Sequence, residues 1–158
     1  MIQLYHGSNV RIVDINLSFG RKGKDFGQGF YLSDDLSQAE KMAQLVTMRE
    51  ESGIPTVSTF LFDDSCMTNG RLSIKQFDSY SVEWADFVVS NRSNTGFKHS
   101  FDIVYGPIAN DAVGVQIRRF MLNYIDINRL VEELKYITPT FQYYFGTIAS
   151  LSYLKSLK

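Results

Sequence analysis

Cysteine is almost absent from this chain of 158 residues, because Cys66 is the only one. A single thiol excludes an internal disulfide and a metal site built from several thiolates, and it fits a reducing compartment, so we expect a cytoplasmic protein. The chain also lacks a basic N-terminal segment followed by an apolar run, and no segment approaches the roughly 20 apolar residues that a membrane span needs. We therefore expect no membrane partner.

An excess of charge of either sign is lacking as well. Sixteen Lys and Arg residues stand against 17 Asp and Glu residues, which gives a formal net charge of −1. This balance supplies no overall field that would attract a nucleic-acid backbone, and it argues against non-specific nucleic-acid binding. Only local basic groups remain as candidates for meeting a phosphate: Arg21, Lys22 and Lys24 in one stretch, Arg118 and Arg119 in another.

Internal repeats and low-complexity segments are missing too. Hydrophobic residues make up 44% of the chain and charged residues 21%, which is ordinary usage for a globular protein and excludes a disordered or fibrous one. A chain of this length can bury a substantial core and fits one domain. We therefore predict a single domain over residues 1–158.

The most informative stretch that is present is KDFGQGFYLS at 24–33, read together with LYHGS at 4–8. Gly27 and Gly29 precede an aromatic, β-prone run, so the backbone is expected to bend tightly and then enter a strand. Glycines let a ligand approach the main chain closely, while Tyr31 supplies a flat ring and His6 a hydrogen-bonding imidazole. The pattern predicts a binding pocket rather than ordinary packing.

The spacing of apolar residues predicts strands and helices that do not alternate strictly. Strands are expected at 2–6, 56–62, 72–77, 101–105 and 141–145, helices at 36–51, 82–92, 113–123, 127–137 and 147–157, and long loops at 10–28 and 93–100. Asp35 is expected to cap the first helix, with Gln38 reaching back as in a capping box. Gly106-Pro107 is expected to stop the fourth strand. This order favours an α+β fold over a doubly wound parallel sheet.

Two motifs give the chain a family resemblance. LYHGS at 4–8 and FGQGFYLS at 26–33, followed by a helix, resemble the first two motifs of ADP-ribosyltransferases whose signature triad is His, Tyr and Glu. The chain is most similar to the bacterial DUF3990 family, regarded as ADP-ribosyltransferase-like, and further matching stretches are WADFV at 84–88 with Asn91-Arg92, DIVYGPIAND at 102–111 and QYYF at 142–145. The resemblance implies one α+β domain of split antiparallel sheets with flanking helices.

The resemblance also implies a site for NAD as co-substrate. It gives His6 a hydrogen bond to a ribose of NAD, Gly7 backbone bonds to the nicotinamide carboxamide, and Tyr31 a stacking contact with the nicotinamide ring. Gln142 stands where the glutamate of the triad belongs. The catalytic residues implied are His6, Tyr31 and Gln142, and the NAD-binding residues are His6, Gly7, Ser8, Gly29, Phe30 and Tyr31.

This sequence departs from the family pattern at three positions. Gln142 carries no charge and is a poor base, so Asp111 and, after it, Asp25 are the carboxylates expected to compensate. The helix after Tyr31 has Ala39 and Met42 where relatives carry a serine and a second stacking tyrosine. The side chains that might replace that ring are Phe26, Phe30 and Tyr144.

Several of these residues also have ordinary structural interpretations. Trp84 is predicted to lie in the core, His99 in an exposed polar loop, and Arg92 on a solvated face. Asp111 follows Asn110 and is interpreted first as part of a helix cap. Two interpretations of Gln142 remain: it contacts a ligand, or it only fills the face of a strand.

The functional expectation is transfer of ADP-ribose from NAD to a protein or nucleic acid, or hydrolysis of NAD, in a bacterial cell. Small members of this kind resemble toxins of toxin–antitoxin or defence pairs, which implies a neutralising antitoxin as partner. The chemistry requires no metal. The rival expectations are a catalytically silent module that binds NAD or ADP-ribose, and a scaffold with an empty cleft.

Overall fold

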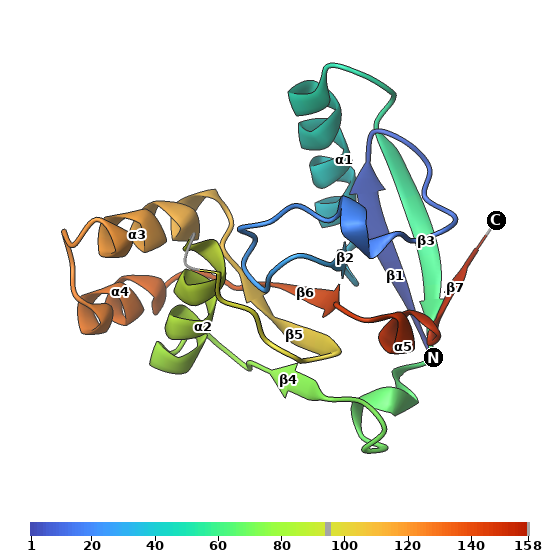
Figure 1. Cartoon of the computed structure of the whole chain (residues 1–158). Coiled ribbons are helices and arrows are strands. Elements are labelled where there is room, and N and C mark those ends of the chain that lie inside the picture. Colours follow the sequence, from blue (N-terminus) through green and yellow to red (C-terminus); the bar gives the residue numbers. More distant parts are fainter. Residues whose placement is uncertain (94–95, 158) are drawn as a thin grey trace.

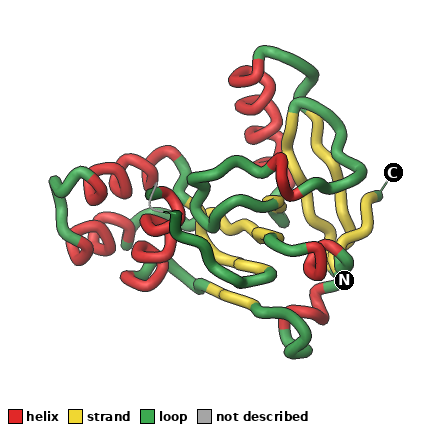
Figure 2. The backbone as a smooth tube through the Cα atoms, in the orientation of Figure 1, coloured by secondary structure: helices red, strands yellow, loops and turns green. Residues whose placement is uncertain are grey.

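A computed structural model describes residues 1–93 and 96–157 and shows an α+β architecture (Figure 1, Figure 2). The strands are β1 (Ile2–Ser8), β2 (Phe30–Leu32), β3 (Thr56–Phe62), β4 (Ile74–Gln76), β5 (Ile103–Ile108), β6 (Thr140–Phe145) and β7 (Leu154–Ser156). The helices are α1 (Leu36–Glu50), α2 (Val82–Arg92), α3 (Asp111–Met121), α4 (Ile127–Leu134) and α5 (Ile148–Leu151), with short 3-10 turns η1 (Leu17–Phe19) and η2 (Asp64–Met67). The predicted α+β class is confirmed.

The strands form two sheets, with orders β1-β3-β7 and β2-β6-β5-β4. The strand pairs are antiparallel, as the resemblance implied, except for β4 and β5, which run parallel. The reason is the connection, because α2 crosses over between β4 and β5 and returns the chain in the same direction. The sheets meet where Tyr5 and Ser33 exchange backbone hydrogen bonds of 2.7 and 2.9 Å.

Helix α1 covers the first sheet and lies against β1 (Figure 1). Asp35 caps it as predicted, since its side chain accepts from the N–H groups of Ser37 and Gln38. Gln38 does not complete a capping box. Its amide oxygen accepts from the hydroxyl of Ser33 instead, and that hydroxyl in turn accepts from the Asp35 N–H. This network ties the start of α1 to the junction of the two sheets.

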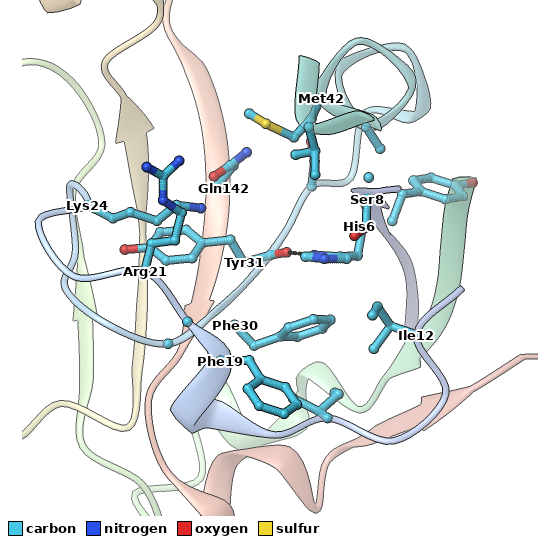
Figure 3. Close-up of a pocket in the computed structure, with 18 of the residues that line it drawn as sticks. His6, Ser8, Ile12, Phe19, Arg21, Lys24, Phe30, Tyr31, Met42 and Gln142 are labelled. Carbon is cyan, nitrogen blue, oxygen red and sulfur yellow. Dashed lines mark hydrogen bonds between the residues drawn. The ribbon is translucent and has the colours of Figure 1, made fainter. Parts of the chain in front are cut away.

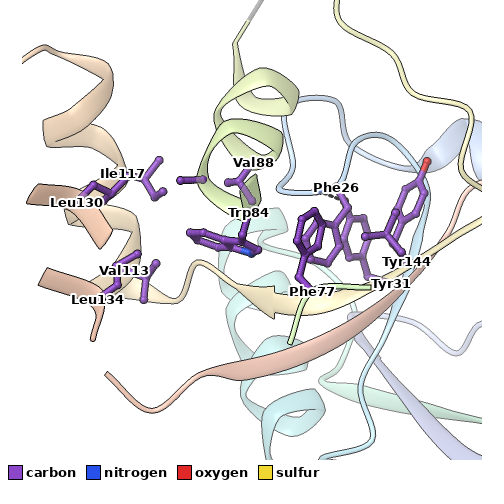
Figure 4. Packing of buried hydrophobic residues seen from close by; sticks show 12 residues of the cluster. Phe26, Tyr31, Phe77, Trp84, Val88, Val113, Ile117, Leu130, Leu134 and Tyr144 are labelled. Atoms are coloured by element: carbon purple, nitrogen blue, oxygen red, sulfur yellow. Dashed lines mark hydrogen bonds between the residues drawn. The ribbon is translucent and has the colours of Figure 1, made fainter. Parts of the chain in front are cut away.

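Helices α2, α3 and α4 pack together beside the second sheet, around one of two clusters of buried apolar side chains. Figure 4 shows Trp84, Val88, Ile117 and Leu130 at the meeting point of these helices. Trp84 is fully buried as predicted, and its indole N–H donates to the Pro107 carbonyl at 2.6 Å. The other cluster lies between the two sheets and includes Leu4, Phe60, Phe62, Ile103 and Phe145.

Strand β5 runs through Gly106 and Pro107, so the expectation that these residues stop it is wrong. Pro107 fits because β4 pairs only with Ile103 to Tyr105, which leaves one edge of β5 free beyond that point. The carbonyl of Tyr105 points to that edge, since it accepts from Phe77, and the ladder alternation sends the Pro107 nitrogen the same way. A missing N–H at an open edge costs no ladder hydrogen bond.

The predicted C-terminal helix at 147–157 is wrong in its second half. Only Ile148–Leu151 is helical, and Leu154–Ser156 forms β7 on the free edge of β3. Leu151 and Leu154 still point inward, against the cluster between the sheets. The predicted loop at 93–100 lies partly outside the described residues. Over the part of the chain that the structure describes, no helix is both long and apolar enough to cross a membrane.

Candidate functional site

A cavity of about 350 Å³ opens where β1 and β2 separate beyond the Tyr5–Ser33 bridge (Figure 3). Helix α1 forms one wall, and the segment from Ile12 to Lys24 forms another. All seven residues that the sequence nominated line this cavity: His6, Gly7, Ser8, Gly29, Phe30, Tyr31 and Gln142. Its volume lies within the range of small-molecule sites, roughly 300–1,000 Å³.

His6 spans the gap between β1 and β2. Its Nδ1–H donates to the Tyr31 carbonyl at 2.8 Å, and its ring stacks on Phe30 with centroids 4.3 Å apart. Burial lowers the pKa of His6 to about 4, and the charge of Lys24 acts in the same direction. The ring is therefore neutral near pH 7. A carbonyl only accepts, so Nδ1 carries the proton and Nε2 is an acceptor.

The Nε2 atom of His6 opens onto the cavity. Within residues 1–93 and 96–157 it has no hydrogen-bond partner, yet every fully enclosed side-chain nitrogen or oxygen of these residues has one. The atom must therefore be reached by solvent, and the cavity is where His6 meets solvent. A neutral imidazole acceptor in that place suits a donor such as a sugar hydroxyl.

Gly7 offers main-chain groups to the same space. In an antiparallel ladder, the N–H and C=O groups of alternate residues point to opposite edges. Tyr5 bonds Ser33 on the edge away from β3, so Gly7, two residues later, also directs its N–H and C=O to that edge. Helix α1 passes so close that a Cβ on Gly7 would lie 2.0 Å from the Ala39 carbonyl oxygen. The close approach of α1 therefore requires glycine at this position, and the free N–H and C=O groups of Gly7 suit contact with a ligand. Ser8, also buried, donates its hydroxyl to Asn9.

Tyr31 contributes a ring face and no titratable group. Its hydroxyl donates to the Gly27 carbonyl at 2.6 Å and accepts from the Phe26 N–H at 3.1 Å. Burial raises the pKa of Tyr31 well above its usual value, so the phenol stays protonated. The ammonium of Lys24 lies 4.6 Å above the ring centroid. The hydroxyl is thus committed to main-chain partners, and the ring is what Tyr31 can offer to a ligand.

Gly29 lets the chain pass tightly over β6 on the way into β2. A Cβ there would lie 2.3 Å from the Tyr144 ring and 2.6 Å from the Phe145 carbonyl oxygen. Phe30 follows and presents its ring to the cavity beside His6. The prediction of a tight bend before a strand is confirmed, and the bend carries Tyr31 and Phe30 into one site.

Gln142 lies on β6, opposite Gly106 in the ladder. Figure 3 shows its amide on the side of the cavity where the Tyr31 ring and Lys24 lie. No hydrogen bond occupies that amide within the described protein, so the side chain is not committed to filling the strand face. The structure thus brings the third motif to the first two.

The carboxylates expected to compensate for Gln142 lie elsewhere. Asp25 is buried and binds the Arg92 guanidinium at 2.6 and 2.7 Å and the Ala109 N–H at 2.7 Å. Asp111 is exposed at the start of α3, behind the cap residue Asn110. Neither lines the cavity, so the expectation fails for both residues: Asp25 is bound to Arg92 and Ala109, and Asp111 lies exposed on α3. Among the described residues that line the cavity, Asp14 is the one carboxylate.

Basic side chains dominate the charge of the cavity. Arg21 and Lys24 come from the long loop, and Arg49 comes from α1, where Glu50 pairs with it at 3.0 Å. Burial lowers the pKa of Lys24; the charge of Asp25 opposes this shift, and the charges of Arg21 and Arg49 add to it. The basic stretch was visible in the sequence. Arg49 was missed, although it continues the helical spacing of Ala39, Met42 and Val46, which line the same wall.

The remaining expectations divide between two cavities. Ala39 and Met42 line the first, as their count from Tyr31 predicted. Of the proposed substitute rings, Phe30 lines it, Phe26 is fully buried away from it, and Tyr144 lines a second cavity of about 540 Å³ behind the loop. Phe26 is thus excluded as a stacking ring because the core encloses it.

Two surface expectations are wrong. Arg92 is not a solvated residue, since it holds the buried Asp25. His99 is half-buried, and its Nε2–H donates to the Phe26 carbonyl while its Nδ1 accepts from the Phe101 N–H. Both nitrogens of His99 are therefore committed. Within residues 1–93 and 96–157, no three His, Cys, Asp or Glu side chains gather in a way that would hold a metal ion.

Comparison with known proteins gives one family and no individual relative. No curated protein matches the chain, and no solved structure does. Residues 2–156 match the family described as Protein of unknown function (DUF3990), which is the family that the motifs predicted. With nearly its whole length covered, the chain belongs to the DUF3990 family.

Proposed function

We propose that the cavity binds NAD as a co-substrate and that the protein transfers its ADP-ribose group to a macromolecular acceptor, a protein or a nucleic acid. The observation that carries the proposal is the convergence of His6, the Gly7 main chain, the Tyr31 ring and Gln142 around one cavity. These residues come from three strands far apart in the sequence, and His6 Nε2, the Gly7 main chain and the Gln142 amide are directed at the cavity.

The chemistry would proceed by exchange at one carbon. The bond between the ribose C1′ and the nicotinamide nitrogen breaks, nicotinamide leaves with the bonding electrons, and an acceptor oxygen or nitrogen bonds C1′ and loses its proton. Positive charge develops on the ribose as the bond stretches, as in glycoside cleavage. Gly7 would hold the carboxamide, Tyr31 would stack on the ring, and His6 Nε2 would accept from a ribose hydroxyl.

Arg21, Lys24 and Arg49 supply a counter-charge for the pyrophosphate of the dinucleotide. Arginine and lysine are the usual partners of phosphate oxygens, and three of them lie on one cavity whose lining, within the described chain, includes Asp14 as its one carboxylate. In the cell we infer the role that the family resemblance implies, a bacterial cytoplasmic toxin of a toxin–antitoxin or defence pair, held by a cognate antitoxin.

A second candidate rests on Gln142. A neutral amide provides neither the charge nor the base that a glutamate would, and losing one such stabilising group costs on the order of 3 kcal/mol in the transition state. A cavity with this substitution could bind NAD or ADP-ribose without turnover. Slow hydrolysis of NAD is the intermediate case.

Release of labelled nicotinamide from NAD, with and without a cell lysate as acceptor source, separates these functions. For an enzyme, Gln142→Ala should abolish release while NAD binding persists, and Gln142→Glu should raise release because it adds a charge beside the ribose. Gln76→Ala is the matched control, since Gln76 is an exposed glutamine on β4 of the same sheet. Binding without release in every variant would establish the binding module, and the absence of both would refute the proposal.

A further inference from the structure

Lys24 occupies the ring face that a nicotinamide would need. Its ammonium lies 4.6 Å from the centroid of the Tyr31 ring, which is cation–π distance. Lys24 as a whole is solvent-exposed, yet its ammonium turns back into the cavity. Figure 3 shows the Lys24 side chain beside Arg21 and Gln142. The adjacent carboxylate, Asp25, is turned away and bound to Arg92.

Within the described chain the Lys24 ammonium forms no ion pair. The nearby charge of Asp25 favours its cationic form, but that carboxylate is bound to Arg92, and the cations Arg21 and Arg49 line the same cavity as Lys24. Elsewhere the Tyr31 ring packs against the buried rings of Phe26 and Tyr144, with centroids 6.3 and 5.4 Å away, so the part that Lys24 covers is the part that meets the cavity. A nicotinamide that stacks on Tyr31 must therefore displace the ammonium and remain close to it.

Charge on the nicotinamide ring then decides how favourable stacking is. The ring of NAD⁺ is a cation, whereas the ring of NADH is neutral, and both molecules carry the same adenosine, ribose and pyrophosphate groups. We propose that Lys24 is a specificity-determining residue that makes the cavity bind NADH and other neutral-ring ligands more tightly than NAD⁺. The inference rests on the proposed function, because it takes the dinucleotide ring to stack on Tyr31.

The same contact bears on the reaction. When the bond to C1′ breaks, the nicotinamide ring changes from a cation to a neutral molecule, so its repulsion by Lys24 is relieved as it leaves. Lys24 thereby weakens NAD⁺ binding more than it opposes departure of the leaving group. The protein would act as a weak binder of its co-substrate, and NADH would compete with NAD⁺ for the site.

Dissociation constants for NAD⁺ and NADH, measured by calorimetry on one protein preparation, test this inference. For wild type we expect NADH to bind about tenfold more tightly. Two unit charges about 6 Å apart in a partly hydrated cavity repel by about 1.4 kcal/mol, which corresponds to a tenfold change in the dissociation constant. Lys24→Met should bring the ratio close to one, because any contact of Lys24 with the pyrophosphate is common to both dinucleotides and cancels in the ratio. Lys24→Arg keeps the charge and should keep most of the preference.

Lys22→Met is the matched control. Lys22 lies two residues away in the same loop but lines the second cavity, so its removal changes the net charge without touching the Tyr31 face. The preference for NADH should survive in this variant. Equal or tighter binding of NAD⁺ to wild type would overturn the inference while leaving the proposed function in place. A preference for NADH that persists in Lys24→Met would also overturn the inference and leave the proposed function in place. If neither dinucleotide binds wild type, the proposed function fails and the inference with it.

Discussion

Gly7 matters both for packing and for the candidate site, because α1 leaves no room for a Cβ atom there. A Cβ added there would lie 2.0 Å from the Ala39 carbonyl oxygen and 2.7 Å from the Ala43 backbone nitrogen. Both are backbone atoms of α1, so no side-chain rotation relieves the contact. The helix must move outward by about 1 Å to reach even a tight contact distance.

The expected cost of Gly7→Ala follows from that displacement. Overpacking of a close-packed interior costs about 1–3 kcal/mol, and here a whole helix must shift away from β1, so we expect a loss near the upper end, about 3 kcal/mol. For a chain of this size each kcal/mol lowers Tm by roughly 2–4 °C, which gives a drop of about 6–12 °C. Because α1 forms a wall of the cavity, NAD binding should weaken as well.

Thermal and urea unfolding followed by circular dichroism measure this prediction. Gly114→Ala is the control, because Gly114 lies inside α3 with nothing within 4 Å of an added Cβ. Alanine is a better helix former than glycine, so this second variant should gain up to about 1 kcal/mol. A Gly7→Ala protein that unfolds within about 0.5 kcal/mol of wild type would refute the close approach of α1 to β1.

Three other predictions concern buried polar groups. Asp25→Ala should destabilise the fold by about 3 kcal/mol in urea unfolding, because it leaves the Arg92 guanidinium without its buried partner; an unchanged midpoint would contradict the pairing. Trp84→Phe should cost about 1–2 kcal/mol, since the Pro107 carbonyl loses its donor, and a neutral effect would show that water replaces it. The pKa of His6 is lowered to about 4 in the folded protein, so as the pH falls His6 takes up a proton in the unfolded chain before it does so in the folded one. The free energy of unfolding should therefore fall by up to about 3 kcal/mol as pH drops from about 6.5 to 4, and His6→Gln should flatten that part of the profile relative to wild type.

The candidate site was predicted from local sequence because its parts are local motifs. His6 with Gly7, and Gly29 with Tyr31, are pairs whose chemistry is visible within a few residues, and the structure brings them together with Gln142. Helix α1 was equally visible, because a capping aspartate precedes a regular apolar spacing. These features depend on backbone conformation over one or two turns.

The errors arose where a residue's environment is set by a distant segment. Arg92 and Asp25 are 67 positions apart, and neither has a sequence neighbour that marks a buried ion pair. Strand β7 forms because β3 offers a free edge, and Pro107 is tolerated because β4 ends before it. Lys24 over Tyr31 belongs to the same class, since the contact requires the loop to fold back across the ring.

The central claim is that the space between β1 and β2 receives a nicotinamide dinucleotide. Amide resonances of glycines, recorded by NMR during titration with NAD⁺ and then NADH, test it most directly, because glycines line both cavities. The account predicts shifts at Gly7, Gly20 and Gly29, which line the first cavity, and little change at Gly23 and Gly146, which line the second. Shifts confined to the second group, or none at saturating dinucleotide, would contradict it.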